Sequence, residues 1–242
     1  MKAVLLAAGA GTRLTGLTTD IPKALVSVRG RPLVDYVLDY TSAGPIEEVV
    51  AIGGYRGELL QEHLEGREGL RFFLNPDFRK GNLLSLLAAR PALQGDLLLL
   101  NVDHIFPLRL LRSFLESSPA RDEPTAFVDF DRPLYDDDMK VDLGDDGRVR
   151  NISKVLERFQ AGYIGSTFIP AGTVDRYLAA ASSVCERSQG MANVEAVLQY
   201  LADAGSGPRV FDASGIRWLE VDTPQDHANA ERILANIEGY LD

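Results

Sequence analysis

The sequence predicts an α/β protein with a Rossmann-like, mainly parallel sheet that is flanked by helices and carries a small strand-rich subregion. Two observations favour this class. Through residues 2–103, short aliphatic runs alternate with amphipathic segments, which is the order of βαβ units. The run 97–102 is apolar almost throughout, as in a parallel strand buried on both faces. A chain of 242 residues is long enough to bury a core on both sides of such a sheet.

Hydrophobic periodicity and Gly or Pro signals predict the elements of the first half in order. They are a strand at 3–7, a helix at 32–43 that Gly44-Pro45 ends, a strand at 49–52, a helix at 56–64, an extended stretch at 70–74, a helix at 82–89, the strand at 97–102 and a helix at 108–116. Asn82 is the expected N-cap of its helix. Asp103 would lie at the carboxyl end of the apolar strand, the edge at which open α/β sheets bind ligands.

The second half of the chain has a different pattern. Residues 125–169 are expected to hold several short strands, separated by acidic and Gly turns such as 144–147, and to lie over the sheet edge. Two helices at 174–183 and 194–204, a short strand ending at Asp222 and a last helix opened by Pro224 complete the chain. Because no repeat, linker or low-complexity tract interrupts it, we expect one domain at 1–242, with halves of about 1–120 and 121–242.

Charge and cysteine content exclude several classes of function. The formal charge of -10 disfavours nucleic acid as the partner, because phosphate backbones are bound by clustered positive surfaces. A small anionic ligand needs only a nest of N–H groups and one or two cations, so it is compatible with this charge. A single cysteine, Cys185, has no paired base in view and fits a reducing compartment, so the expected location is cytoplasmic. The apolar start is too short for a membrane span, and a homo-oligomer stays open.

The strongest signal for chemistry is the loop after the first strand. It reads Leu6-Ala7-Ala8-Gly9-Ala10-Gly11-Thr12-Arg13-Leu14, and Pro22-Lys23 and Gly30-Arg31-Pro32-Leu33 follow it. Glycines directly after a strand let backbone N–H groups approach phosphate oxygens closely. Arg13 can make forked contacts to a triphosphate and Lys23 can act as a point charge, so both are candidate catalytic residues. The Rossmann fingerprint fails because Leu14 replaces its third glycine, and the P-loop fails because no Gly-Lys-Ser/Thr follows.

This loop and the Pro-Lys pair resemble the N-terminal signature of the sugar-phosphate nucleotidylyltransferase superfamily. The resemblance covers nearly the whole chain, with 102–103 and 218–226 as later landmarks. It implies the nucleotide-diphospho-sugar transferase fold and a reaction in which an acceptor phosphate attacks the α-phosphorus of an NTP and pyrophosphate leaves. It also implies that Asp103 and Asp222 hold a catalytic Mg²⁺, which takes one or two carboxylates together with phosphate oxygens. Glu220, on the same strand face as Asp222, is a weaker metal candidate.

The middle of the chain is similar to cytidylyltransferases that act on phosphocholine, inositol 1-phosphate or phosphonates, through the segments 75–76, 81–82, 85–86, 138–141, 152–154 and 162–165. This similarity implies that Lys140 and Lys154 face the acceptor phosphate. Val102-Asp103-His104 is similar to the inositol-phosphate branch, although Val102 replaces the usual glycine, and His104 becomes a further acceptor candidate. The nucleotide-binding candidates, placed in the half at about 1–120, are Leu6, Ala7, Ala8, Gly9, Ala10, Gly11, Thr12, Gly81, Asn82 and Ser85.

Several alternatives stay open. CTP is the favoured nucleotide, and a UTP-, GTP- or dTTP-using enzyme for sugar 1-phosphates is the alternative within the class. A non-catalytic nucleotide-binding regulatory subunit is disfavoured because the candidate catalytic and metal residues are all present. A retaining glycosyltransferase could have a similar architecture, so fold analogy alone does not distinguish it from a nucleotidyltransferase. The triphosphate-type loop disfavours the glycosyltransferase. The run Asp136-Asp137-Asp138 is interpreted as a solvated loop, and His63 and His227 as structural residues.

Overall fold

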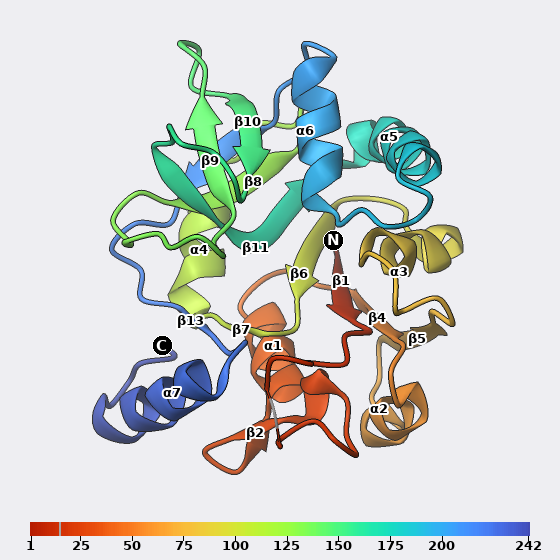
Figure 1. Cartoon of the computed structure of the whole chain (residues 1–242), viewed down its shortest axis with the longest axis vertical. Helices are drawn as coiled ribbons and strands as arrows, with labels where there is room; N and C mark the ends of the chain where they lie inside the picture. Colours follow the sequence, from red (N-terminus) through yellow and green to blue (C-terminus); the bar gives the residue numbers. More distant parts are fainter. Residues whose placement is uncertain (15) are drawn as a thin grey trace.

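A computed structural model describes residues 1–14 and 16–242, which form an α/β fold around a nine-stranded mixed sheet (Figure 1). The main path of the sheet runs β10-β9-β11-β6-β1-β4-β5, and β8 pairs with both β11 and β12. The strands are β1 (Lys2–Ala7), β4 (Glu48–Gly53), β5 (Leu70–Leu74), β6 (Leu97–Asn101), β8 (Thr125–Asp129), β9 (Lys140–Leu143), β10 (Val149–Ser153), β11 (Ala161–Ile169) and β12 (Arg209–Asp212).

The first half of the chain builds the parallel part of the sheet. β1 pairs in parallel with β4 and with β6, and β4 pairs in parallel with β5. Side chains of β1 alternate between the two faces, with Val4 and Leu6 in one hydrophobic cluster and Ala3 and Leu5 in the other. Burial on both faces explains why this strand reads as a continuous apolar run.

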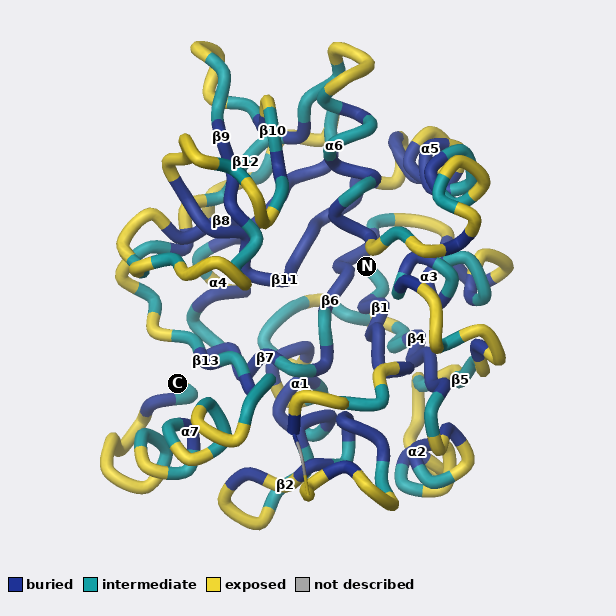
Figure 2. The backbone as a smooth tube through the Cα atoms, in the orientation of Figure 1, coloured by how far each residue is buried: buried dark blue, intermediate teal, exposed yellow. Residues whose placement is uncertain are grey.

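Helices cover both faces of the sheet. On one face lie α3 (Leu83–Ala88), α5 (Val174–Arg187) and α6 (Glu195–Asp203), and on the other lie α1 (Leu33–Ser42), α2 (Gly57–Leu64) and α4 (Leu108–Glu116). Phe114 of α4 packs against the rings of Phe127, Phe168 and Phe211 at centroid distances of 4.6, 5.1 and 5.2 Å. Figure 2 shows the buried strands in the middle of the molecule and the exposed residues on outer turns.

β11 reverses the direction of the sheet. It pairs antiparallel with β6, β8 and β9, and all of its residues are buried. The expectation of a parallel strand at 97–102 is therefore correct only on the side of β1, because β6 has an antiparallel partner on its other side. The strand-rich subregion predicted at 125–169 corresponds to β8, β9, β10 and β11.

Two short ribbons and the last helix lie at the carboxyl edge of the parallel strands. β2 (Ser27–Val28) pairs with β3 (Arg31–Pro32), and β7 (His104–Ile105) pairs with β13 (Leu219–Glu220). The second ribbon brings the end of β6 beside the C-terminal segment, and Val221 N donates to Asp103 O at 2.9 Å. The strand expected to end at Asp222 ends two residues earlier, and α7 (Pro224–Asn236) begins at the predicted proline.

The remaining elements are single helical turns at Lys23–Leu25, Arg90–Ala92 and Ala171–Thr173. Predicted and observed helix ends agree within one residue for most helices, whereas α5 continues four residues beyond the predicted end at 183. In the part of the chain that the structure describes, no helix is both long enough and apolar enough to cross a membrane.

Candidate active site

The loop after β1 shows the close backbone approach that its glycines predict. Gly11 has a φ of 62°, and a Cβ there would lie 2.8 Å from Thr18 Cγ2 and 3.1 Å from Lys23 Cβ. Thr18 Oγ1 donates to Gly11 O at 2.9 Å, and Lys23 N donates to Gly9 O at 3.4 Å. Gly11 therefore lets the lysine lie against the loop, while the space beside Gly9 is open.

Lys23 joins two acidic residues from distant parts of the chain. Its Nζ donates to Asp103 Oδ2 and to Asp222 Oδ1, each at 2.7 Å, and its side chain is 7% exposed. Burial alone would lower the pKa of Lys23, but the two carboxylates raise it above its usual value. Burial alone would raise the pKa of Asp103, but Lys23 and His104 hold it well below its usual range. Lys23 and Asp103 are therefore both charged at neutral pH.

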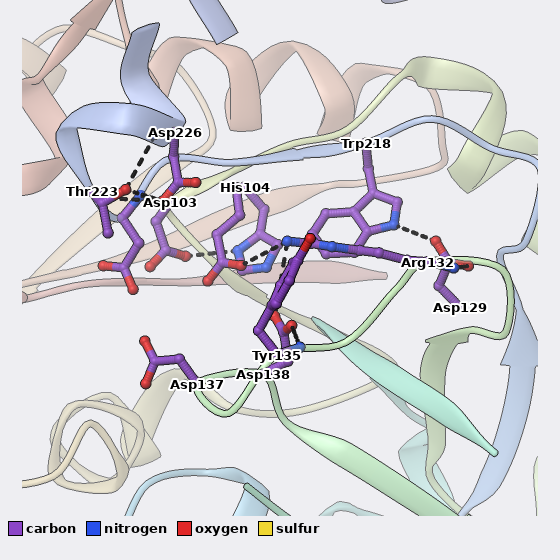
Figure 3. A network of polar contacts seen from close by, with 12 residues as sticks. Asp103, His104, Asp129, Arg132, Tyr135, Asp137, Asp138, Trp218, Thr223 and Asp226 are labelled. Carbon is purple, nitrogen blue, oxygen red and sulfur yellow. Dashed lines mark hydrogen bonds and ion pairs between the residues drawn. The ribbon is translucent and has the colours of Figure 1, made fainter. Parts of the chain in front are cut away.

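A capping box at the start of α7 positions Asp222. Thr223 Oγ1 accepts from Asp226 N at 3.2 Å, and Asp226 Oδ2 accepts from Thr223 N at 2.9 Å and from Asp222 N at 3.3 Å. Pro224 takes the first helical position, where no backbone donor is needed. Figure 3 shows Thr223 and Asp226 on the same side of the site as Asp103.

Arg13 connects the glycine loop to the second half of the chain. Its guanidinium forms ion pairs with Asp222 and with Asp137. Lys154 Nζ lies 3.4 Å from Asp137 Oδ1, so one carboxylate is shared by two of the predicted phosphate-binding cations. Asp137 is exposed, as expected for a solvated loop, but it is also paired across the site, which the sequence did not predict.

The carboxylates of Asp103 and Asp222 fit a Mg²⁺ ion. Both reach one ammonium at 2.7 Å, so they lie close enough to share a small cation. Within residues 1–14 and 16–242, no three His, Cys, Asp or Glu side chains form a complete metal cluster. Mg²⁺ does not require one, because it binds one or two carboxylates and completes its shell with water and phosphate oxygens.

Glu220, the weaker metal candidate, has another neighbour. Its Oε2 lies 3.8 Å from Arg132 Nη2, and burial raises the pKa of its carboxyl group. It is half-buried and lines the same cavity as Asp222. The position of Glu220 thus places it in the wall of the site, and a role as metal ligand stays a prediction.

His104, the predicted acceptor contact, is buried between aromatic rings. Its ring centroid lies 5.4 Å from those of Phe106 and Trp218, and its Nδ1 lies 2.7 Å from Asp103 Oδ1. Burial alone would lower the pKa of His104, but Asp103 raises it. Gly165, with a φ of 73°, makes room for the imidazole, because a Cβ there would lie 2.8 Å from His104 Cε1.

Arg132 and Trp218 form a wall of the site that sequence reasoning missed (Figure 3). Arg132 Cζ lies 4.3 Å from the centroid of the Trp218 ring, and Trp218 Nε1 donates to Asp129 Oδ2 at 2.9 Å. Arg132 also lies 3.8 Å from Asp138. The available signal was that Trp218, the only tryptophan of the chain, opens the C-terminal landmark at 218–226.

Two cavities meet at Asp103. One, of about 210 Å³, lies beside the glycine loop and has in its wall Leu6, Ala8, Gly9, Lys23, Asn82 and Ser85. The other, of about 180 Å³, has in its wall Arg13, His104, Lys154, Glu220 and Asp222. We call them the loop-side and the far cavity. Both are lined by Asn82, Asn101, Asp103 and Asn193. Predicted nucleotide and acceptor residues therefore fall mainly on opposite sides of a predicted metal ligand.

Not all predicted nucleotide-binding residues line the loop-side cavity. Its wall does not include Ala7, Ala10, Gly11, Thr12 or Gly81. Ala7 is buried in β1. Gly81 serves packing, because a Cβ there would lie 1.8 Å from Ala192 O. Direct nucleotide contacts from these positions stay predictions.

Asn82 connects two helices rather than capping its own. It precedes α3, but its side chain makes no capping bond there. Instead, Asn82 Oδ1 accepts from Val194 N at 2.8 Å, and Asn82 N donates to Asn193 Oδ1 at 3.0 Å. The predicted N-cap position of Asn82 is confirmed, but its side chain makes no capping bond, because the start of α6 lies close enough to compete for it. Ser85 Oγ accepts from Asn75 Nδ2 at 3.0 Å.

Lys140 does not face the far cavity. Its ammonium donates to Tyr135 O at 2.8 Å and to Lys154 O at 2.7 Å, and the side chain is buried. The prediction that Lys140 meets the acceptor phosphate disagrees with this geometry, because backbone carbonyls of the 135–138 loop take up its donors. Lys154, by contrast, is partly exposed and lines the cavity.

Two cavities that meet at Asp103 are compatible with the class of enzyme that the sequence predicts, which joins two phosphorylated substrates. Residues 3–140 match the MobA-like NTP transferase domain family, and the chain belongs to that family. The predicted membership of a nucleotidyltransferase family is thereby confirmed.

The chain is similar to two longer bacterial proteins. It is 30% identical over 268 residues to the CMP-5'-(3-aminopropyl)phosphonate synthase of Streptomyces rubellomurinus, covering 99% of this chain and 41% of that protein. It is 32% identical over 238 residues to the bifunctional IPC transferase and DIPP synthase of Rubrobacter xylanophilus, covering 96% of this chain and 51% of that protein. The chain thus spans about half the length of these relatives, or less.

A solved structure shares the fold. The inositol-1-phosphate CTP transferase from T. maritima superposes with a TM-score of 0.81 at 23% identity, covering 98% of this chain and 97% of the other. At that identity the likeness concerns the fold, and it confirms the predicted α/β class.

Proposed function

We propose that the chain is a Mg²⁺-dependent cytidylyltransferase that transfers CMP from CTP to a small phosphorylated or phosphonylated acceptor. An oxygen of the acceptor forms a bond to the α-phosphorus of CTP, the bond from that phosphorus to the bridging oxygen breaks, and pyrophosphate leaves. No protein nucleophile is needed, so the task of the chain is to position two anions and offset their charge.

The observation that carries this proposal is the meeting of two cavities at Asp103. The loop-side cavity is lined by Gly9 and Lys23 and would hold the nucleotide. The far cavity is lined by Lys154 and would hold the acceptor. Because both include Asp103, the reacting phosphates would meet beside this carboxylate.

Two cations of the chain can offset the charge of the phosphates. Lys23 stays protonated at neutral pH because its pKa is raised, so it acts as a positive charge and not as a base. Arg13 carries a forked donor that suits phosphate oxygens. Both cations are paired with Asp222 in this structure, so anionic substrates would compete with a carboxylate for them.

Asp103 and Asp222 would hold the Mg²⁺ ion, which when bound supplies positive charge between nucleotide and acceptor phosphates. Their fixed placement by Lys23 and by the α7 capping box keeps both carboxylates in position before substrates bind. Asp103 is ionised at neutral pH, as a ligand for a cation must be.

The choice of CTP is supported by the similarities in the middle of the chain and by the relatives. The Streptomyces protein is named for a CMP-linked phosphonate, and the solved T. maritima protein for CTP and inositol 1-phosphate. A UTP-, GTP- or dTTP-dependent enzyme is the competing proposal within the same class.

The test is a matrix of CTP, UTP, GTP, dTTP and ATP against phosphorylated acceptors, with pyrophosphate release as the readout. We expect Mg²⁺-dependent release that is highest with CTP and that falls at least about 100-fold in Asp103→Asn and Asp222→Asn. Higher rates with another NTP would overturn the CTP assignment, and near-wild-type turnover in either variant would overturn the metal assignment. NTP binding without turnover on any acceptor would support the regulatory alternative.

A further inference from the structure

Glu195 has a buried carboxyl group in which one oxygen is left without a hydrogen-bond partner. It is the first residue of α6, it is 9% exposed, and it lines the far cavity together with Asn193. Its Oε2 has no hydrogen-bond partner, and within residues 1–14 and 16–242 no other side chain forms an ion pair with it. A buried carboxyl oxygen without a donor is costly, so this oxygen needs an explanation.

The other carboxylates of the same cavity have partners. Asp103 and Asp222 accept from Lys23, Asp129 accepts from Trp218, and Asp137 pairs with Arg13. Asp138 accepts from Tyr135 N at 2.6 Å. Glu220 forms an ion pair with Arg132 at 3.8 Å. Among the described residues, Glu195 is thus the carboxylate of this cavity that has no ion pair and no side-chain hydrogen bond, and burial raises the pKa of its carboxyl group.

The aromatic rings that line the cavity are covered by other side chains or buried. Trp218 has the Arg132 guanidinium at 4.3 Å from its ring centroid and the His104 ring stacked at 5.4 Å. Tyr163 is almost fully buried, and its hydroxyl group is bonded to Thr167 Oγ1 at 2.8 Å. A quaternary ammonium is recognised by free aromatic faces, and this cavity offers few of them.

We infer that Glu195 accepts a hydrogen bond from an N–H or O–H group at the end of the acceptor that lies away from the phosphate. The acceptor is then an amino- or hydroxyalkyl phosphate or phosphonate, and not a quaternary ammonium compound. This inference rests on the proposed function. It uses Lys154 as the anchor for the phosphate, since both Lys154 and Glu195 line the far cavity.

The test compares three kinds of acceptor with the full chain, CTP and Mg²⁺. Phosphoethanolamine and 3-aminopropylphosphonate carry an ammonium donor, glycerol 3-phosphate and inositol 1-phosphate carry hydroxyl donors, and phosphocholine carries none. We expect kcat/KM for the best donor-bearing acceptor to exceed that for phosphocholine at least about tenfold, because a hydrogen bond to a charged group gives a preference of this order.

The Glu195→Gln variant distinguishes an ammonium donor from a hydroxyl donor on the acceptor. The amide oxygen still accepts a hydrogen bond but carries no charge, so ammonium acceptors should lose at least about tenfold in kcat/KM and hydroxyl acceptors much less. The KM for CTP should not change. Glu157→Gln, an exposed carboxylate in the same half of the chain, is the control for net charge and should match the wild type.

Three outcomes would overturn the inference. One is a kcat/KM for phosphocholine that equals that of phosphoethanolamine. A second is a Glu195→Gln variant that acts like the wild type on every acceptor. The third is an equal loss on all acceptors together with a lower unfolding temperature, which would show a structural role. We expect an unchanged or higher unfolding temperature, since the change replaces a buried carboxyl group that has an unpaired oxygen with a neutral amide of the same size.

Calorimetric binding of phosphoethanolamine and phosphocholine tests the inference apart from turnover. Tighter binding of phosphoethanolamine that Glu195→Gln abolishes would support it even in an assay without pyrophosphate release. In that case the proposed function would fail and the binding site would stand. Equal binding of the two compounds would overturn the inference whatever the enzyme activity.

Discussion

Gly165 and Gly147 are a matched pair of glycines that can test how closely His104 is held. Both have a φ of 73°, so an alanine at either costs about 1–2 kcal/mol in backbone strain. Only at Gly165 would the new Cβ meet a side chain, at 2.8 Å from His104 Cε1, whereas at Gly147 it would meet no atom within 4 Å.

We therefore expect Gly165→Ala to lose more stability than Gly147→Ala, by about 1–3 kcal/mol, and to lower kcat/KM at least about tenfold. Urea unfolding and steady-state kinetics of the two variants check this. Equal effects in both would mean that His104 can shift freely and that its position beside Asp103 is not important.

Asp137 pairs with two cations that are expected to bind the substrate phosphates. Its carboxylate pairs with Arg13 and Lys154, the positions that phosphates are expected to take. Asp137→Asn should therefore lower the KM for the acceptor about two- to fivefold and change stability by no more than about 0.5 kcal/mol, because the carboxylate is exposed. Asp136→Asn is the control, since the Asp136 carboxylate forms no ion pair within residues 1–14 and 16–242. A higher KM in Asp137→Asn would show that this carboxylate assists substrate binding.

Local motifs indicate those candidate site residues whose proposed role depends on their immediate neighbours in the sequence. Gly11, Lys23 and Asp103 could be identified from short sequence patterns. These patterns are glycines directly after a strand, the Pro-Lys pair and an acidic residue at the end of a strand. Arg132 and Glu195 could not, because nothing near them in the sequence shows that β8, α6 and the C-terminal segment meet at one cavity. Lys140 was misplaced for the same reason, since the loop that takes up its donors is arranged by tertiary contacts.

The start of α7 couples helix stability to the position of a candidate metal ligand. Thr223→Ala removes one side of the capping box and should cost about 1 kcal/mol in the free energy of unfolding. It should also lower kcat/KM about tenfold, because Asp222 N is held by Asp226 of the same cap. Urea unfolding and pyrophosphate release measure the two effects.

Ser117→Ala is the matched control for that cap. It removes the hydrogen bond from Ser117 Oγ to Phe114 O at 2.6 Å, at the far end of another helix. It should change stability by less than about 1 kcal/mol and leave kcat/KM at the wild-type value. An activity loss in Ser117→Ala equal to that in Thr223→Ala would show that the cap acts through general stability and not through Asp222.

The elements themselves were largely predictable because each has its own periodicity. The helix at 108–116 and the extended stretch at 70–74 match α4 and β5. Pairing was harder to predict, since the apolar run of β6 is the same whether its neighbour is parallel or antiparallel. The direction of β11 follows from the path of the chain through β8, β9 and β10. The sequence of β6 therefore does not predict whether β11 runs parallel or antiparallel to it.

The two halves of the chain contribute to one site and one sheet. The first half supplies Lys23 and Asp103 and the second supplies Asp222, so neither half contains the site alone. β11 of the second half also covers the edge of β6, and an uncovered apolar edge strand is prone to aggregation. These contacts favour the prediction of one domain at 1–242 over two domains joined by a hinge.

The fluorescence of Trp218 can test the prediction that residues 1–242 form one domain. Trp218 is the only tryptophan, and it packs on His104 of the first half and Arg132 of the second, so its fluorescence reports the junction. Far-UV circular dichroism reports the helices of both halves. If the chain is one cooperative unit, the two signals should show coincident urea transitions with the same midpoint. Fluorescence that changes well before the helical signal would instead mean that the junction opens while each half keeps its fold, and that the cavities on the two sides of Asp103 belong to two separate domains.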